Sequence, residues 1–399
     1  MRRIIIFTGK GGVGKTSVAA AHARKAALMG KNTLIVSADM AHNLGDLFEM
    51  PIGKEVTKIA EKLYALEIDP NYEMEHDFSS MLNAFDKLFP NKRTEQEDGD
   101  FGDMSMFPGM EELFSLLKIQ ELYESRQYDV IIVDCAPTGE TLSLLKFPEL
   151  FSWYMEKLFP IEKVAMKVLR PIGKKFFQIE LPDSRAMNDI EKLYVKLVGL
   201  QQLFKDREVC SIRLVTMPEK MVVEETKRNY MYLNLYNFNI DGLFINRILP
   251  DKIDTAFFNE WVDIQASYIE ELENVFDNIP IGYIKWYATD INGLEAVDRL
   301  VEDVMTEDTL FEVRRNKPNE VYEKNTEGYL LTVNLPFVNK EDIKIYETGS
   351  DVIIRIGNFK RCIPLPDSLR KYVVSSAKMK EESIAIQFAL QEGDTADET

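Results

Sequence analysis

The chain opens with a short apolar run, a glycine-rich loop and an alanine-rich segment. Residues 4–7 are apolar and mostly β-branched, as in strands that are buried in a parallel sheet. Residues 17–29 predict a helix that ends at Gly30, and residues 33–37 predict a second strand. This strand–helix–strand order predicts a parallel sheet with right-handed crossovers.

More apolar runs follow along the next two hundred or so residues. They predict strands at 129–133, 212–216 and 242–246. Helical insertions are expected between them, at about 70–125 and at about 143–205. The first contains the acidic stretch 95–100, which is typical of a solvated loop, and the second has apolar residues at helical spacing in its later half. We therefore predict a doubly wound α/β fold.

The pattern changes near residue 315. The polar stretch 314–320 contains Pro318 and predicts a linker. Beyond it, apolar and polar residues alternate with a period of two, in the runs 329–335, 352–356 and 384–388. Such alternation, interrupted by proline and glycine, predicts a small antiparallel β-sandwich.

These patterns divide the 399 residues into four expected parts. They are an α/β domain over 1–315, a linker over 316–325, a β-sandwich over 326–391 and an acidic tail over 392–399.

Charge and cysteine content limit the function. The net charge of −18 repels nucleic-acid phosphates and anionic lipid, so we expect no nucleic-acid partner. The three cysteines, Cys135, Cys210 and Cys362, are far apart and form no CxxC pair, which suits a reducing compartment. No stretch has the roughly 18 apolar residues that a membrane span needs. We expect a soluble, cytoplasmic protein.

The loop after the first strand matches the phosphate-loop pattern G-x-x-x-x-G-K-[ST]. Its glycines let backbone N–H groups turn towards phosphates at a helix N-terminus. Lys15 is expected to reach the β- and γ-phosphates, and Thr16 to bind Mg²⁺ directly. The expected nucleotide-binding residues of the loop are Gly9, Lys10, Gly11, Gly12, Val13, Gly14, Lys15, Thr16 and Ser17.

Lys10 makes this loop unusual, because cradling a phosphate does not require it. The sequence GKGGVGKT resembles the deviant Walker A motif of the ATPase class that contains nitrogenase iron protein and arsenical pump ATPases. In that class the corresponding lysine reaches the nucleotide of a partner subunit. The resemblance therefore implies a homodimer and a catalytic role for Lys10.

Two further segments, SADMAHNLGD at 37–46 and VDCAPTGETL at 133–142, follow predicted strands. With LEIDP at 66–70 and FINRILP at 244–250, they resemble the arsenical-pump and tail-anchored-protein-targeting ATPase family over about residues 1–305. The resemblance implies an ATP hydrolase that uses ATP and Mg²⁺.

The resemblance also implies roles for single residues. Asp39 matches the switch I aspartate that activates the attacking water, and Asp134 matches the Walker B aspartate, both holding Mg²⁺ through water. Asn246 matches the asparagine that reads adenine, while the loop from Pro280 into 290–294 wraps the base. The expected switch II residues are Thr138, Gly139 and Glu140, of which Thr138 and Gly139 sense the γ-phosphate. The expected catalytic residues are Lys10, Lys15, Asp39 and Asp134.

The chain departs from the family pattern at several positions. Met40 replaces the usual proline, and Glu140 stands where many members have histidine, which changes the charge beside switch II. Arsenite-binding members have clustered cysteines, and a trivalent arsenical needs such soft ligands. The region 252–279, which matches the zinc-linked dimer contact of eukaryotic targeting members, has no cysteine. We expect no zinc-linked dimer.

The C-terminal part resembles an α-crystallin (small heat-shock protein) domain, through YLLTVNLP at 329–336, KEDI at 340–343 and AKMKEESIAI at 377–386. Residues 144–177 are rich in methionine and aromatic residues and are interspersed with lysines. A helical insertion of this composition can form a groove for an apolar client helix.

Together these features predict a homodimeric, Mg²⁺-ATP-dependent ATPase that captures and releases a hydrophobic client, such as a membrane protein tail. A membrane receptor is a further candidate partner. Two alternatives stay open: an arsenite-efflux ATPase subunit, and a nucleotide-switched scaffold or chaperone that acts through its β-sandwich.

Overall fold

The structure is a computed structural model of the whole chain. It describes residues 2–39, 43–76, 110–136, 138–139, 141–143, 145–146, 189–250, 256–305, 308–314, 318–348, 351–365, 369 and 371–390. The acidic stretch 95–100, almost all of the expected client groove 144–177 and the tail 392–399 lie outside these residues.

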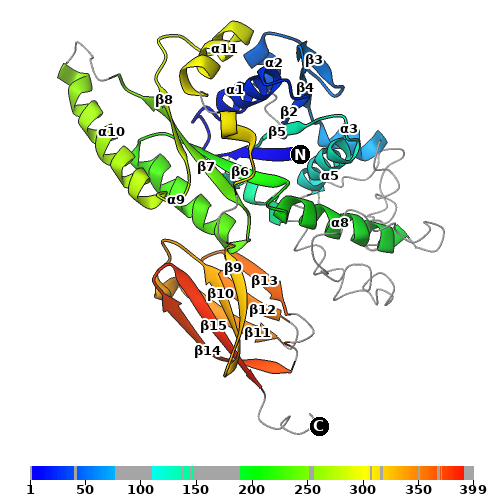
Figure 1. Cartoon of the computed structure of the whole chain (residues 1–399), viewed down its shortest axis with the longest axis vertical. Coiled ribbons are helices and arrows are strands. Elements are labelled where there is room, and N and C mark those ends of the chain that lie inside the picture. Colours follow the sequence, from blue (N-terminus) through cyan, green and yellow to red (C-terminus); the bar gives the residue numbers. More distant parts are fainter. Residues whose placement is uncertain are drawn as a thin grey trace, which may run out of the picture. The chain divides into compact units, whose positions relative to one another are not determined.

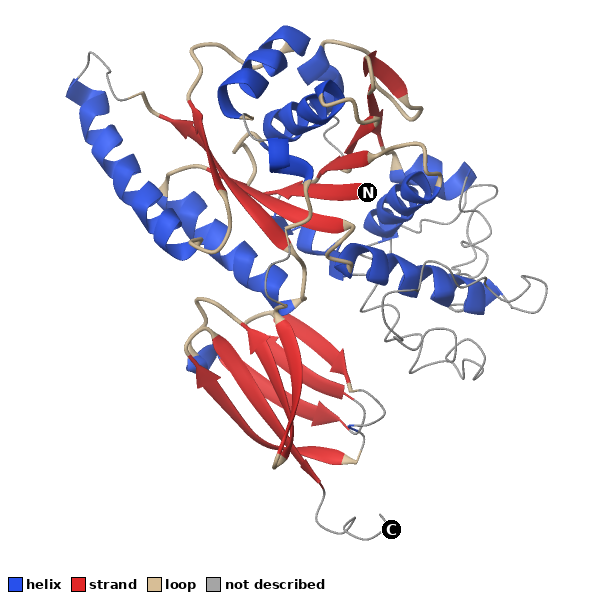
Figure 2. Cartoon of the chain, viewed as in Figure 1, coloured by secondary structure: helices blue, strands red, loops and turns tan. Residues whose placement is uncertain are grey.

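The largest sheet has eight strands in the order β3-β4-β2-β5-β1-β6-β7-β8. Figure 2 draws the strands of the chain in red and its helices in blue. Neighbouring strands pair in parallel at β4–β2, β2–β5, β5–β1, β6–β7 and β7–β8. Strand β3 pairs with β4 antiparallel. The predicted α/β fold with a parallel sheet is confirmed.

The chain forms two compact units, Met1–Cys210 with Tyr287–Val313, and Ser211–Trp286 with Arg314–Thr399. The first unit contains β1 (Arg3–Thr8), β2 (Thr33–Ser37), β3 (Thr57–Ala60), β4 (Leu63–Glu67) and β5 (Val130–Asp134). Its helices are α1 (Lys15–Leu28), α2 (Asn43–Phe48), α3 (Pro70–His76), α5 (Met110–Glu124), α8 (Asp189–Lys205) and α11 (Gly293–Val304), with a 3₁₀ turn at Asp308–Phe311.

The core of the first unit forms around β1, β2 and β5, in which every residue is buried. Their β-branched side chains fit a strand that is covered on both faces. Helix α1 packs against β5 and α11, and α5 packs against α3 and α8 (Figure 1). Arg24 on α1 forms a two-pronged pair with Asp298 on α11, with N···O distances of 2.6 and 3.1 Å.

Two helical predictions are confirmed here. The alanine-rich helix forms, but it begins at Lys15 rather than Ser17 because Gly14 adopts a left-handed conformation and starts it. The helical spacing in the later half of the second insertion corresponds to α8.

The second unit completes the α/β part of the chain and carries the sandwich. Its α/β elements are β6 (Cys210–Thr216), α9 (Lys220–Leu235), β7 (Ile240–Ile248), α10 (Ala256–Val275) and β8 (Ile281–Lys285). The sandwich strands are β9 (Glu320–Asn325), β10 (Gly328–Asn334), β11 (Ile343–Thr348), β12 (Asp351–Ile356), β13 (Phe359–Pro364), β14 (Tyr372–Lys380) and β15 (Ser383–Leu390), with a 3₁₀ turn at Lys340–Asp342.

The sandwich consists of a four-stranded sheet, β14-β15-β10-β9, and a three-stranded sheet, β11-β12-β13. All of its pairings are antiparallel. The fully buried side chains of its interior include Leu331, Val333, Ile354, Ile386 and Phe388. The antiparallel sandwich that the alternating pattern predicts is therefore confirmed.

The expected linker 316–325 differs from the structure. Its second half is strand β9, which pairs with β10 along its whole length, for example Tyr322 with Leu331. The segment is polar and so lacks a strand signal of its own. Backbone pairing and the buried ion pair between Glu320 and Arg361 hold it in the sheet.

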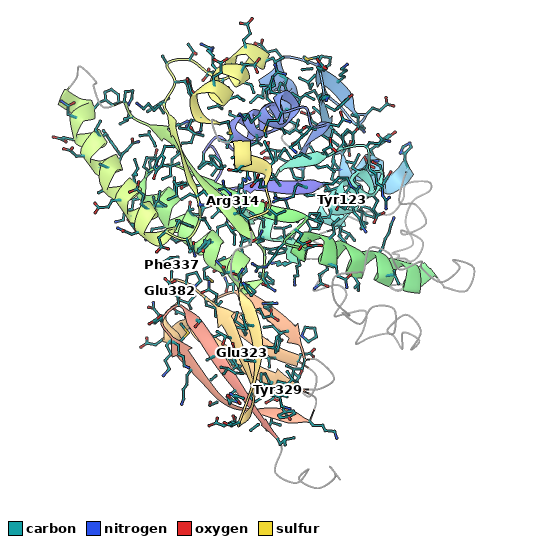
Figure 3. All side chains as sticks on the ribbon, in the orientation of Figure 1. Tyr123, Arg314, Glu323, Tyr329, Phe337 and Glu382 are labelled. Atoms are coloured by element: carbon teal, nitrogen blue, oxygen red, sulfur yellow. The ribbon has the colours of Figure 1, made fainter. Side chains whose placement is uncertain are left out.

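The sandwich contacts α9 through specific groups. The ring of Tyr232 stacks on Phe359 with centroids 3.6 Å apart, and the Tyr236 hydroxyl donates to the Lys360 carbonyl at 3.1 Å. Arg361 donates to the Leu235 carbonyl at the C-terminal end of α9. Figure 3 labels Phe337 and Glu382 at this end of the sandwich, and Glu323 and Tyr329 farther along it.

Among the described helices, none combines the length and apolar character that crossing a membrane requires.

Candidate nucleotide-binding site

The register of the sheet brings three loops of the first unit together. Asp134 at the end of β5 is level with Phe7 on β1 and with Ser37 on β2. Backbone bonds continue this alignment past the strands, because Ala38 N donates to the Asp134 carbonyl at 2.9 Å. Since carboxyl ends of parallel strands share one edge, the phosphate loop, Asp39 and Asp134 meet there.

The phosphate loop adopts a conformation that requires glycine. Gly12 has φ 81° and Gly14 has φ 88°, in the left-handed region. Gly14 offers no side chain to cap α1, and the first turn of α1 has no acidic residue, so its N–H groups and dipole favour an anion. Lys15 is buried, and its Nζ lies 3.4 Å from the Lys10 carbonyl of the loop. This geometry fits a bound phosphate, with Lys15 held over the loop.

Asp134 is the most perturbed carboxylate of the site. It is 1 % exposed, the Thr16 hydroxyl donates to it, and its Oδ1 has no hydrogen-bond partner among the described residues. Burial, with a smaller contribution from the nearby Asp39 carboxylate, raises the pKa of Asp134 to about 7, against the lowering effects of the Thr16 hydrogen bond and Lys15. A cation bound at this position would instead lower the pKa of Asp134 and favour its charged form.

These donors fit a magnesium ion. A threonine hydroxyl and two carboxylates are hard oxygen ligands, and an orphaned buried carboxylate oxygen needs a positive partner. In the part of the chain that the structure describes, no group of three or more His, Cys, Asp or Glu side chains forms an alternative metal cluster.

Asp39 is oriented by a residue that the sequence analysis did not single out. The Ser37 hydroxyl accepts a hydrogen bond from Asp39 N and donates to the Asp39 carbonyl, both at 3.3 Å. A serine two residues before a polar turn residue is a recognisable turn signal. Met40 lies outside the described residues.

The segment predicted to be switch II is partly described. Thr141 donates to the Ala136 carbonyl at 2.6 Å and closes the turn, and the buried Thr138 hydroxyl has no partner among the described residues. Such a hydroxyl can bind a phosphate oxygen. Glu140 lies outside the described residues.

Cys135 follows Asp134 directly but is a poor ligand candidate. Its side chain is buried, and burial raises the pKa of the thiol far above its ordinary value, with Asp134 adding to the effect. Cys210 and Cys362 are buried as well. Thiols in this state are unreactive structural groups.

Asn246 and Pro280 belong to the second unit. Asn246 is a buried residue of β7, and its Oδ1 accepts a hydrogen bond from Arg247 N at 2.8 Å. The Pro280 carbonyl accepts from Leu243 N at 3.0 Å and so begins the pairing of β8 with β7. The loop 290–294 belongs to the first unit, where Gly293 begins α11 after Asn292.

A strand–loop–helix cradle with a threonine and two aspartates at neighbouring strand ends defines a phosphate-loop nucleoside triphosphatase. Within that class, the chain belongs to the anion-transporting ATPase family, whose model matches residues 2–306. The HSP20-like domain found in these ATPases matches residues 326–388. The resemblance seen in the sequence is therefore confirmed, and the protein is an ATP hydrolase.

Relatives differ in how much of the chain they match. The chain is 32 % identical over 394 residues to arsenical pump-driving ATPase 1 of Aquifex aeolicus, covering 96 % of this chain and 99 % of that protein. A second A. aeolicus protein, arsenical pump-driving ATPase 2, is 29 % identical over 295 residues, covering 73 % of this chain and 96 % of its own length. ATPase get3 of Pyrenophora tritici-repentis is 28 % identical over 320 residues, covering 75 % of this chain and 90 % of its own.

Proposed function

We propose that the protein is a Mg²⁺-dependent, homodimeric ATPase that couples ATP hydrolysis to the capture and release of a hydrophobic client. The observation that carries the hydrolytic part is the buried Asp134 carboxylate, which receives the Thr16 hydroxyl and keeps an unpartnered oxygen beside the phosphate loop. Burying a carboxylate oxygen without a partner costs free energy, and a bound cation would supply that partner.

The residues then divide the work of phosphoryl transfer to water. The loop N–H groups and Lys15 bind the phosphates, and Thr16 with Asp134 and Asp39 holds Mg²⁺, which when bound neutralises phosphate charge. Asp39, held by Ser37, orients the attacking water, and Thr138 with Gly139 senses the γ-phosphate. Positioning and charge stabilisation supply the rate, because this reaction needs little covalent help.

The dimer is supported by Lys10, whose position in the loop is not required by a cradle within one subunit. A complementation assay tests it. If Lys10 acts on the partner's nucleotide, Lys10→Ala and Asp39→Asn are each inactive alone, but mixing them restores turnover in the mixed dimer. In that dimer, the site of the Lys10→Ala subunit keeps its own Asp39 and receives Lys10 from the Asp39→Asn subunit, so this one site is complete. Absence of restored activity, with subunit exchange verified, would contradict the proposal.

The client is supported by the similarity to ATPase get3, a member of the tail-anchored-protein-targeting branch that the sequence resembles. We would trap the ATP state with Asp39→Asn and present a photo-crosslinkable transmembrane tail with ATP, with ADP and without nucleotide. A crosslink within residues 144–205 that depends on nucleotide is expected. Its absence in all three states, with ATP binding intact, would refute a client groove.

The scaffold alternative is favoured by the contacts of the sandwich with α9, which tie it to the ATPase unit that carries β7. A chain truncated after residue 315 distinguishes the two. Arsenical pump-driving ATPase 2 of A. aeolicus aligns with 73 % of this chain over 96 % of its own length, so a shorter relative of this ATPase exists. Client binding survives truncation if the groove binds, and disappears if the sandwich binds. An arsenite-efflux role would require arsenite or antimonite to raise ATP turnover.

A further inference from the structure

The pairing register of strand β7 shifts at Asn246, the residue that we propose to recognise adenine. The pairing of β7 with β8 is continuous to Ile245 and resumes at Ile248, with a shift between them. Arg247, in the shifted segment, has φ 57°. This is a β-bulge, which re-aims a side chain and leaves backbone groups without ladder partners.

A side chain from α10 supplies those partners. Gln265 is 7 % exposed, and its Oε1 accepts a hydrogen bond from Leu249 N at 2.9 Å. Its Nε2 donates to the Arg247 carbonyl at 3.3 Å. The amide of Gln265 therefore acts as a short substitute for a neighbouring strand.

The side chain of Asn246 binds the backbone N–H of Arg247, the residue whose carbonyl Gln265 binds. Its Oδ1 accepts from Arg247 N at 2.8 Å, so the N–H of Arg247 is held by Asn246 and the C=O by Gln265. The orientation of the Asn246 amide thus depends on the backbone of Arg247, and that backbone depends on Gln265.

We infer that Gln265 is a positioning residue for base recognition, which fixes the Asn246 amide so that it selects adenine. This inference rests on the proposed role of Asn246. A side-chain amide pairs well with adenine because its oxygen accepts from the amino group of the base and its NH₂ group donates to a ring nitrogen. In inosine an oxygen replaces the amino group, so a misaligned amide loses the ability to distinguish the two bases.

The test compares ATP, ITP and inorganic tripolyphosphate binding to the full-length protein with Mg²⁺. Gln265→Leu removes both hydrogen bonds, and we expect ATP affinity to fall about tenfold while ITP and tripolyphosphate affinities change little. Gln265→Glu keeps the acceptor for Leu249 N and loses the donor, so a smaller loss is expected. Ser267→Ala, an exposed position on the same helix, is the matched control and should bind all three ligands normally.

Asn246→Ala separates this inference from the proposed function. If Asn246→Ala loses ATP selectivity and both Gln265 variants keep it, the positioning role is wrong while the adenine role stands. If Asn246→Ala keeps full selectivity, the adenine role fails and the inference fails with it. An equal loss for all three ligands in the Gln265 variants would show a general structural effect and overturn the inference. If Gln265→Leu does not fold, Gln265→Glu decides.

Discussion

Gly282 on β8 lies opposite Phe244 on β7, and the two residues are register partners. A Cβ added at Gly282 would lie 2.6 Å from two carbons of the Phe244 ring. Carbon atoms in good contact are about 3.5–4.0 Å apart, so the overlap is about 1 Å. We predict that Gly282→Ala destabilises the protein because this ring must move.

The magnitude follows from the packing. The ring is mostly buried, so it cannot move outward without exposing apolar surface. Overpacking of this kind costs about 1–3 kcal/mol, against a gain of about 0.5 kcal/mol from the lower chain entropy of alanine. We expect a net loss of about 1–2 kcal/mol in the free energy of unfolding. Gly53→Ala is the matched control, since an added Cβ there meets nothing within 4 Å.

Urea unfolding of the single and double variants measures the effect. Phe244→Leu alone should destabilise by about 1–2 kcal/mol, because it removes part of a buried side chain. In the double variant the smaller leucine leaves room for the new methyl group. Its loss in unfolding free energy should therefore be about 1 kcal/mol smaller than the sum of the two single losses. Strict additivity, or a Gly282→Ala variant as stable as the control, would refute the reasoning.

Three further predictions follow from the site and the two units. Thr16→Val should raise the Mg²⁺ concentration for half-maximal phosphate release at least about tenfold, because it removes a proposed direct ligand and the donor to Asp134; an unchanged Mg²⁺ titration would argue against that ligand. Arg361→Met should lower the unfolding free energy by about 3 kcal/mol, since it leaves the Glu320 carboxylate buried without its positively charged partner, and adding Glu320→Gln should recover much of the loss; no recovery in calorimetry would contradict this. Tyr283 donates to Glu273 at 2.5 Å, and burial together with Glu273 raises the pKa of Tyr283 to about 12. Its stabilisation should therefore be complete below about pH 10 and be lost as the pH rises towards 12, so unfolding midpoints of wild type and Tyr283→Phe should converge over that range.

Much of the ATPase part could be predicted from local sequence. The phosphate loop is recognisable because its glycines and lysine act within one turn of chain. The strands β1, β2 and β5 are recognisable because both of their faces are buried and most of their positions are apolar or β-branched. The roles of Asp39 and Asp134 came from the family resemblance, and they remain proposals.

Other features could not be predicted because they depend on residues that are distant in sequence. Strand β9 has a polar sequence and exists because β10 pairs with it. The perturbed pKa of Asp134 arises from burial and from Thr16, Lys15 and Asp39, which come from other segments.

The sequence by itself determined which chemistry the chain carries: a phosphate cradle, acidic strand ends and an alternating C-terminal sandwich. Only the tertiary structure decided how that chemistry is held, through the bulge at Arg247, the α10 amide of Gln265 and the Arg361 contact with α9. The physical reason is that propensity and periodicity are local properties, whereas desolvation and the pairing of buried polar groups are fixed only when distant segments pack together.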